Sequence, residues 1–149
     1  MTRALPDELK PYPACIEIPI QWGDHDAFGH VNNTVPLRWF ESARIALIER
    51  CGLHEWMKPG GQGPVLASIT CHYRKQLFYP DKVLIGARMS RMGRTSMHLA
   101  HAVYSQTQRQ IAVDGEAVIV LFDFDRGRPV RIPSEVHEIF ERLQPHNDA

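Results

Sequence analysis

One helical segment, followed by an unbroken series of strand patterns, is the feature that most restricts the fold of this 149-residue chain. Residues 34–51 carry apolar side chains around most of the helical circumference, which is typical of a buried helix. Before it, Ile16, Ile18, Ile20 and Trp22 alternate with other residues and predict a strand with one buried face. Pro19 places that strand at a sheet edge or at a bulge. After the helix, strand patterns occupy residues 65–75, 82–92, 95–107 and 110–125.

The connections between the last three strands leave room only for tight hairpin turns. The dipeptides Gly93-Arg94 and Gln108-Arg109 separate them, so we expect consecutive antiparallel neighbours. One buried helix lies between the first and second of five long strands. This order predicts an α+β fold in which an antiparallel sheet curls around a central helix.

Local signals set the ends of these elements. Gly52 stands where a left-handed cap is expected to end the long helix. Ser134 is expected to begin a short C-terminal helix at about 134–144, which Pro145 ends. Residues 58–64 are rich in glycine and proline and indicate a loop without regular structure. We expect a single domain over residues 1–149, with its core at about 14–126.

The charge balance excludes partners that depend on a strong electrostatic field. Lysine plus arginine and aspartate plus glutamate number 17 each, so the chain has no long-range attraction for nucleic acid or for an anionic membrane. No segment approaches the roughly 20 apolar residues of a membrane span, and the N-terminus lacks a signal-peptide pattern. A cytoplasmic protein is expected. Three cysteines without Cys-x-x-Cys spacing predict neither a disulfide framework nor a thiolate metal site.

The segment 22–33 carries the strongest functional signal. It places Asp26 between the end of the first strand and the start of the helix. The first amides of a helix have no intrahelical partner, and the helix dipole favours negative charge at that end. A negative oxygen that develops on a substrate could therefore be held close to the Asp26 carboxylate.

The sequence Asp-x-x-Gly-His-Val-Asn-Asn at residues 26–33, with Glu-x-Ala-Arg at residues 41–44, resembles the signature of a known family. It is similar to the hotdog-fold acyl-CoA thioesterases of the 4-hydroxybenzoyl-CoA thioesterase type. The resemblance implies a five-stranded antiparallel sheet wrapped around a central helix, hydrolysis of an acyl-CoA without a cofactor or metal, and a homodimer or homotetramer. One departure is Pro36, where the family usually has an aromatic residue.

The resemblance marks Asp26 as the catalytic carboxylate. A thioester has a thiol leaving group with an ordinary pKa near 8.5, so its hydrolysis needs mainly a nucleophile and a stabilised oxyanion. Asp26 could attack the carbonyl or could deprotonate a water, and the sequence leaves both routes open. The backbone amides of Asn33 and Thr34 are the candidates for the oxyanion hole, Asn33 by analogy with the family. The alternative for Asp26 is a structural turn or a helix cap.

Two further polar residues have both a functional and a structural interpretation. His30 could orient Asp26, touch the substrate or bond across a subunit contact, although a loop histidine is more often structural. Glu41 could position the lytic water. The first interpretation of Glu41, however, is an ion pair with Arg38 or Arg44, each three residues away on the helix.

Substrate binding is assigned to aromatic and basic side chains. Phe28 and Trp39, together with Trp22 and Pro36, are candidates for the wall of the acyl pocket. Four basic residues could meet the phosphates of coenzyme A, and we expect two of them to be real contacts: Arg74, Lys75, Arg91 and Arg94.

Two other functions remain as alternatives. The chain could be a non-catalytic module that binds acyl-CoA or acyl carrier protein, because a fold does not fix a function. A metal-dependent hydrolase is less favoured, although oxygen and nitrogen ligands are present in Asp24, His25, Asp26 and His30. Serine hydrolase chemistry is disfavoured because no Gly-x-Ser-x-Gly elbow occurs.

Overall fold

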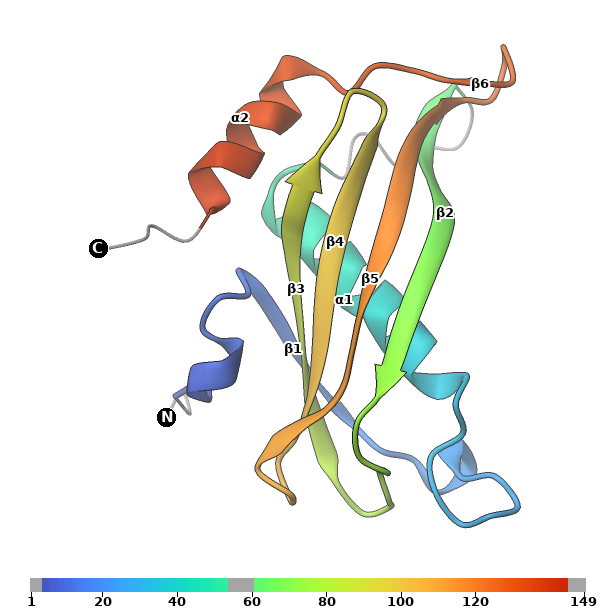
Figure 1. Cartoon of the computed structure of the whole chain (residues 1–149), viewed down its shortest axis with the longest axis vertical. Helices are drawn as coiled ribbons and strands as arrows, with labels where there is room; N and C mark the ends of the chain where they lie inside the picture. The colour runs from blue at the N-terminus through green and yellow to red at the C-terminus, as the bar shows by residue number, and fades with distance from the viewer. Residues whose placement is uncertain (1–3, 54–60, 145–149) are drawn as a thin grey trace.

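The computed structural model describes residues 4–53 and 61–144 and contains the predicted curled antiparallel sheet (Figure 1). Five long strands run in the order β1-β3-β4-β5-β2, and every pairing is antiparallel. A two-residue strand, β6 (Arg128–Pro129), pairs with β5 and was not predicted. The long strands are β1 (Ala14–Pro19), β2 (Gln62–Tyr73), β3 (Lys82–Met92), β4 (Ser96–Ser105) and β5 (Gln110–Asp123).

Helix α1 (Val35–Arg50) packs against one face of this sheet, as predicted (Figure 1). Pro36 lies in its first turn, where the missing amide hydrogen costs no intrahelical bond. The helix ends at Arg50, and Gly52, which follows the C-cap residue Cys51, has a φ of +72°, the left-handed conformation expected there. The Gly52 amide donates to the Glu49 carbonyl at 3.1 Å. The side chains of α1 that face the sheet are fully buried and include Phe40, Ala43 and Leu47.

The contact between α1 and the sheet depends on a glycine in β5. A Cβ atom at Gly115 would lie 2.1 Å from the Thr70 carbonyl oxygen and 2.9 Å from the Phe40 ring. The absent side chain therefore lets Phe40 rest directly on the sheet. There it stacks on His101 of β4, with ring centroids 4.8 Å apart and an interplanar angle of 16°. This stack is the centre of the helix–sheet interface.

His101 is an unusual residue for such a core. It is 1% exposed, and neither of its ring nitrogens has a hydrogen-bond partner among the described residues. Burial, and secondly the positive charge of Arg44, lower the pKa of His101 to about 3. The imidazole is therefore neutral near pH 7 and acts as an aromatic core residue.

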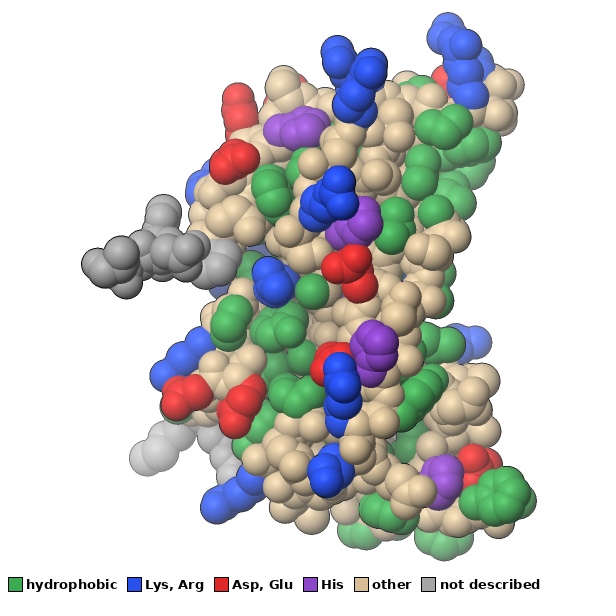
Figure 2. Space-filling view, in the orientation of Figure 1, with side chains coloured by type: hydrophobic (Ala, Val, Ile, Leu, Met, Phe, Trp, Pro, Cys, Tyr) green, Lys and Arg blue, Asp and Glu red, His purple; other side chains and the backbone are tan. Residues whose placement is uncertain are grey.

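The opposite face of the sheet is polar. Arg74 forms two hydrogen bonds of 3.2 Å with Asp114, and the His98 ring lies 2.7 Å from Glu116. Figure 2 shows charged and histidine side chains running down this face. The sheet consequently buries one face against α1 and exposes the other, which explains the alternating pattern in its strands.

The first strand is shorter than the sequence predicted. β1 ends at Pro19, and Trp22–Asp24 form a 3₁₀ turn instead of continuing the strand. The Asp24 carboxylate accepts the Gln21 amide hydrogen at 2.7 Å, which stabilises this turn. Trp22 is 72% exposed and packs against the rings of His25 and Tyr79, so its assignment to a buried strand face was wrong.

The starts of β2 and α2 can also be compared with the sequence prediction. The loop predicted over 58–64 is replaced by strand from Gln62 onward, because Gln62 to Pro64 pair with the end of β5. Residues 58–60 lie outside the described residues. Helix α2 (Ser134–Leu143) begins at Ser134 as predicted, although Pro133 occupies its N-cap position and Ser134 makes no side-chain cap. Pro145 also lies outside the described residues.

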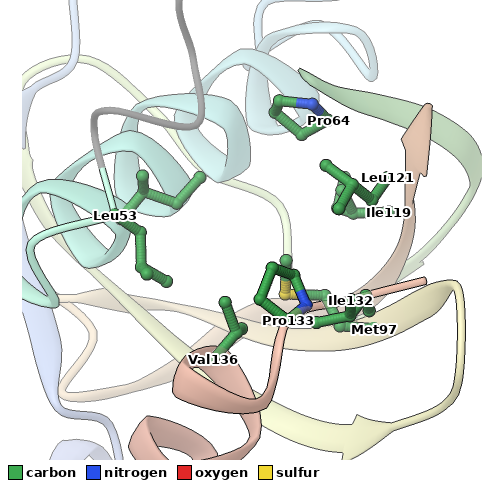
Figure 3. A pocket seen from close by; sticks show the side chains of 9 residues that line it. Leu53, Pro64, Met97, Ile119, Leu121, Ile132, Pro133 and Val136 are labelled. Carbon is green, nitrogen blue, oxygen red and sulfur yellow. The ribbon is translucent and has the colours of Figure 1, made fainter. Parts of the chain in front are cut away.

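An apolar pocket lies where α2 meets the end of α1 (Figure 3). Its volume is about 40 Å³, and Figure 3 shows side chains from several elements converging on it. A water molecule there would find almost no polar partner, so the pocket suits apolar groups. The lining residues are Ile48, Leu53, Pro64, Met97, Ile119, Leu121, Ile132, Pro133 and Val136. No helix within residues 4–53 and 61–144 is long and apolar enough to cross a membrane.

Candidate active site

Asp26 lies in a loop that is closed by backbone hydrogen bonds of Asp26 itself. Its amide donates to the His30 carbonyl at 3.0 Å, and its carbonyl accepts the Gly29 amide hydrogen at 3.1 Å. Gly29 has a φ of +81°, a conformation that side-chain-bearing residues rarely adopt. The Asp26 carboxylate accepts the Phe28 amide hydrogen at 2.9 Å. The structural turn considered for Asp26 is therefore present, and one carboxylate oxygen is held by it.

Asp26 also lines an open cleft of about 420 Å³. The cleft is formed by the loop, the first turn of α1, the end of β2 with the residues that follow it, and one residue of β5. Tyr73 closes one side by donating its hydroxyl hydrogen to the Asn33 carbonyl. Burial raises the pKa of Tyr73 to about 12, which keeps this donor protonated. The lining residues besides Asp26 are His30, Val31, Asn33, Pro36, Tyr73, Arg74, Lys75, Gln76, Leu77 and Val113.

The two amides proposed for an oxyanion hole have different surroundings. The Thr34 amide donates to the side-chain oxygen of Asn32 at 3.0 Å, and Thr34 does not line the cleft. The Asn33 amide has no hydrogen-bond partner within the described ranges, and Asn33 lines the cleft with Asp26. Of the two amides, only that of Asn33 is free to bind a substrate oxygen without breaking an existing hydrogen bond.

The four basic candidates separate into two pairs. Arg74 and Lys75 line the cleft. Arg91 and Arg94 lie at the far end of β3 and in the turn after it. Arg91 is nine residues along β3 from Lys82, or about 30 Å at the ordinary rise of a strand. Of the four basic candidates, therefore, only Arg74 and Lys75 lie close to Asp26 within one chain.

Comparison with known proteins matches residues 20–140 to the model of one family, the thioesterase-like superfamily. The chain belongs to this superfamily. The match covers the Asp26 loop, α1 and all the long strands except β1. The recognition of a hotdog-fold thioesterase made from the motif is confirmed, and the chain is a thioester hydrolase.

Individual relatives of this superfamily are distant in sequence but similar over most of the chain. A long-chain acyl-CoA thioesterase of Escherichia coli, FadM, is 23% identical over 118 residues, which are 79% of this chain and 89% of that protein. The chloroplastic acyl-acyl carrier protein thioesterase ATL3 of Arabidopsis thaliana is 24% identical over 90% of this chain and 70% of its own. A Thermus thermophilus thioesterase, solved with coenzyme A and Zn, superposes with a TM-score of 0.77 at 28% identity, covering 90% of this chain and 96% of its own.

Besides Thr34, Arg91 and Arg94, three more residues predicted for the site of this thioesterase lie outside the Asp26 cleft. Phe28 is 86% exposed, and Glu41 is exposed on α1. Trp39 is 5% exposed and borders a separate hollow with Arg38 and Ser42. Their roles in catalysis and binding stay predictions, and each would need a second subunit or a movement of the chain to reach the substrate.

The ion pair expected for Glu41 is not formed among the described residues. No salt bridge joins it to Arg38 or Arg44. Arg44 is 6% exposed, and its buried Nη1 atom has no hydrogen-bond partner in residues 4–53 and 61–144. Burial lowers the pKa of Arg44, and the negative charge of Glu41 offsets part of that shift. Glu41 therefore acts on Arg44 at a distance rather than through a direct contact.

The four possible metal ligands in the loop do not gather around one point. The Asp24 carboxylate accepts the Gln21 amide hydrogen, and His25 Nε2 accepts the Tyr79 amide hydrogen at 2.8 Å. No group of three or more metal-ligating side chains occurs within the described parts of the chain. The geometry of these residues gives the metal-dependent hydrolase no support.

Sequence reasoning missed two polar contributors to the cleft and one partner of Asp26. Tyr73 and Gln76 line the cleft, although the segment around Tyr73 was considered only for its positive charge. The Asn32 side chain lies 3.4 Å from the Asp26 carboxylate, a contact that the loop motif did not indicate. Tyr73 and Asn33 are 40 residues apart, so no local spacing signals their contact.

Proposed function

We propose that this thioesterase hydrolyses an acyl-CoA, with a fatty or aromatic acyl group, to the free acid and coenzyme A. One observation carries the proposal: Asp26 and Asn33, whose backbone amide is unpaired among the described residues, line the same open cleft. A nucleophile or base and an oxyanion donor are the two groups that thioester hydrolysis needs. The names of the Escherichia coli and Thermus thermophilus relatives support coenzyme A as the thiol carrier.

Two chemical routes fit this arrangement. In the first, an Asp26 oxygen attacks the thioester carbonyl, coenzyme A leaves as the thiolate, and water hydrolyses the resulting mixed anhydride. In the second, Asp26 accepts a proton from water, the hydroxide attacks the carbonyl directly, and the C–S bond then breaks to release coenzyme A as the thiolate. In both routes the Asn33 amide would donate to the negative oxygen of the tetrahedral intermediate, a contact typically worth ~3 kcal/mol in the transition state.

The proposal is tested by measuring thiol release from a panel of acyl-CoAs that spans short, medium, long and aromatic acyl groups. We expect turnover of at least one class, and the profile identifies the acyl group. The same acyl groups on acyl carrier protein test the alternative carrier that the Arabidopsis relative's name suggests. Binding of acyl-CoA without any turnover would favour the non-catalytic binding module instead.

Coenzyme A recognition can be separated from chemistry at Lys75. This residue lines the cleft, and its ammonium group has no ion-pair or hydrogen-bond partner in the described part of the chain. Arg74 also lines the cleft but already holds Asp114 with two hydrogen bonds. We expect Lys75→Ala to raise KM for acyl-CoA while kcat changes little, because phosphate contacts exist in ground and transition states alike. A contact worth roughly 1 to 3 kcal/mol corresponds to about 5- to 150-fold.

The control is an acyl-pantetheine thioester that lacks the nucleotide. Lys75→Ala should leave its KM unchanged, and added salt should reduce the difference between the two substrates. Arg91→Ala and Arg94→Ala should raise KM only if a second subunit brings these residues to the cleft. An equal loss on both substrates would show that Lys75 supports the acyl site or the fold.

We propose that the protein forms a homodimer, or a homotetramer of two dimers, in the cytoplasm. Strand β2 is a 12-residue edge with no strand on its outer side among the described residues, and Leu66 on it is 45% exposed. Long exposed edges of this kind are usually covered. Pairing of two such edges by a two-fold axis would also place the partner near Tyr73 at the end of β2, beside the cleft.

Sedimentation at micromolar concentration should show a dimer or a tetramer. Leu66→Glu should shift the population toward monomer, because it places charge at the centre of the proposed contact. Leu5→Glu, at a site that is 42% exposed and away from β2, is the matched control and should leave the assembly intact. A stable wild-type monomer would refute the shared edge.

A further inference from the structure

The Asn32 side chain joins the Asp26 carboxylate to the start of helix α1. Its amide nitrogen lies 3.4 Å from Asp26 Oδ2. Its oxygen accepts two hydrogen bonds from Thr34, from the backbone amide at 3.0 Å and from the hydroxyl at 2.6 Å. One side chain thus connects the proposed catalytic carboxylate to the chain segment that carries the proposed oxyanion donor, Asn33.

The chemistry of these neighbours fixes which end of the amide faces Asp26. The Thr34 backbone N–H can only donate, so the Asn32 atom next to it must be the oxygen. The amino group then points to Asp26, where an ionised carboxylate can only accept. A reversed amide would place its amino group against the Thr34 N–H and its oxygen against the Asp26 carboxylate. Donor would then face donor and acceptor would face acceptor, so only one orientation of the amide fits.

The backbone of Asn32 is fixed as firmly as its side chain. Its amide donates to the Asp24 carbonyl at 2.9 Å, and its carbonyl accepts the Val35 amide hydrogen at 3.0 Å. The residue is half-buried. Its side chain therefore approaches Asp26 from an anchored position, which is what the positioning of a catalytic group requires.

We propose that Asn32 is a positioning residue that orients Asp26 Oδ2 for the reaction. The inference rests on the proposed function of Asp26. The Phe28 amide holds Oδ1 at 2.9 Å, so the two carboxylate oxygens have different donors from opposite sides. A distance of 3.4 Å is long for a strong bond, and catalytic contacts of this kind commonly shorten when substrate binds.

Two substitutions separate positioning from helix capping. Asn32→Ser keeps an oxygen that can accept the Thr34 amide hydrogen, but it is too short to reach Asp26. Asn32→Asp also keeps the acceptor, yet it puts a second carboxylate beside Asp26 in place of the donor. A residue that only capped the helix would tolerate both changes, because serine and aspartate are good caps.

We expect Asn32→Ser to lower kcat about 10-fold with little change in KM. In Asn32→Asp the acid limb of the kcat/KM profile should move to higher pH, because two adjacent carboxylates resist ionising together. The other titratable and charged groups that line the cleft are His30, Tyr73, Arg74 and Lys75, with Asp24 and His25 in the same loop. These groups are unchanged in both variants, so a shift of the acid limb results from the substitution at residue 32.

A titration that does not depend on activity completes the test. The ¹³C signal of the Asp26 carboxyl group, assigned by its loss in Asp26→Asn, should titrate with a higher midpoint in Asn32→Asp than in wild type. Equal midpoints, an unmoved acid limb and wild-type kcat in both variants would overturn the inference. If the midpoint moves but no acyl-CoA is hydrolysed by the wild type, the contact is real and the proposed function is what fails. Urea unfolding of each variant verifies that the fold is intact.

Discussion

Replacement of Asp26 by Asn should lower turnover of acyl-CoA by ~10²-fold or more while substrate binding is kept. The amide has nearly the same size and its oxygen can still accept the Phe28 amide hydrogen, so the loop should keep its shape. It cannot attack the thioester, and it cannot take a proton from water. Steady-state kinetics give kcat, and equilibrium binding of a non-hydrolysable acyl-CoA analogue gives the affinity.

Asp24→Asn is the matched control for this prediction. Asp24 lies two residues away, and its carboxylate accepts the Gln21 amide hydrogen at 2.7 Å, a bond that an asparagine oxygen can also accept. Its kcat should therefore stay within a few-fold of wild type. If the two variants lose activity equally, or if Asp24→Asn is the worse, then the roles within the loop are assigned to the wrong carboxylate.

The largest effect on stability is expected from Phe40→Ala. Phe40 is 0% exposed, stacks on His101 and fills the space that Gly115 leaves open. Truncation of a buried phenylalanine typically costs 3–5 kcal/mol, because transfer energy and packing are both lost. It also uncovers His101, whose ring nitrogens have no partner in the described ranges. Urea unfolding at one fixed protein concentration measures the loss, since oligomerisation makes stability depend on concentration.

Phe124→Ala provides the comparison for that measurement. Phe124 is 51% exposed and makes one aromatic contact, with Phe122 at 5.6 Å between ring centroids. Its truncation should cost less than about 1 kcal/mol. A loss at Phe40 no larger than the loss at Phe124 would mean that the helix–sheet contact is not the centre of the core.

The sequence identified Asp26, but it did not identify which basic residues line the cleft beside it. Asp26 was recognised because the loop motif is continuous, from residue 26 to residue 33, and its neighbours in sequence are its neighbours in space. Arg91 and Arg94 could not be distinguished from Arg74 and Lys75 in the same way. All four are basic residues at or just beyond the ends of strand patterns, and only the direction and pairing of β2 and β3 show which pair meets the Asp26 cleft.

The sequence by itself determined the order and type of the elements. Period-two alternation, a helix that is apolar on most sides and tight turns are local properties, and they predicted the antiparallel β3-β4-β5 unit and helix α1. The sequence could not decide contacts between distant segments. The Tyr73 bond to Asn33, the place of Phe40 on Gly115 and the free Asn33 amide arise only when β2, β5 and α1 pack together. Such contacts depend on strand register and close packing, which are set by the whole chain and leave no local pattern.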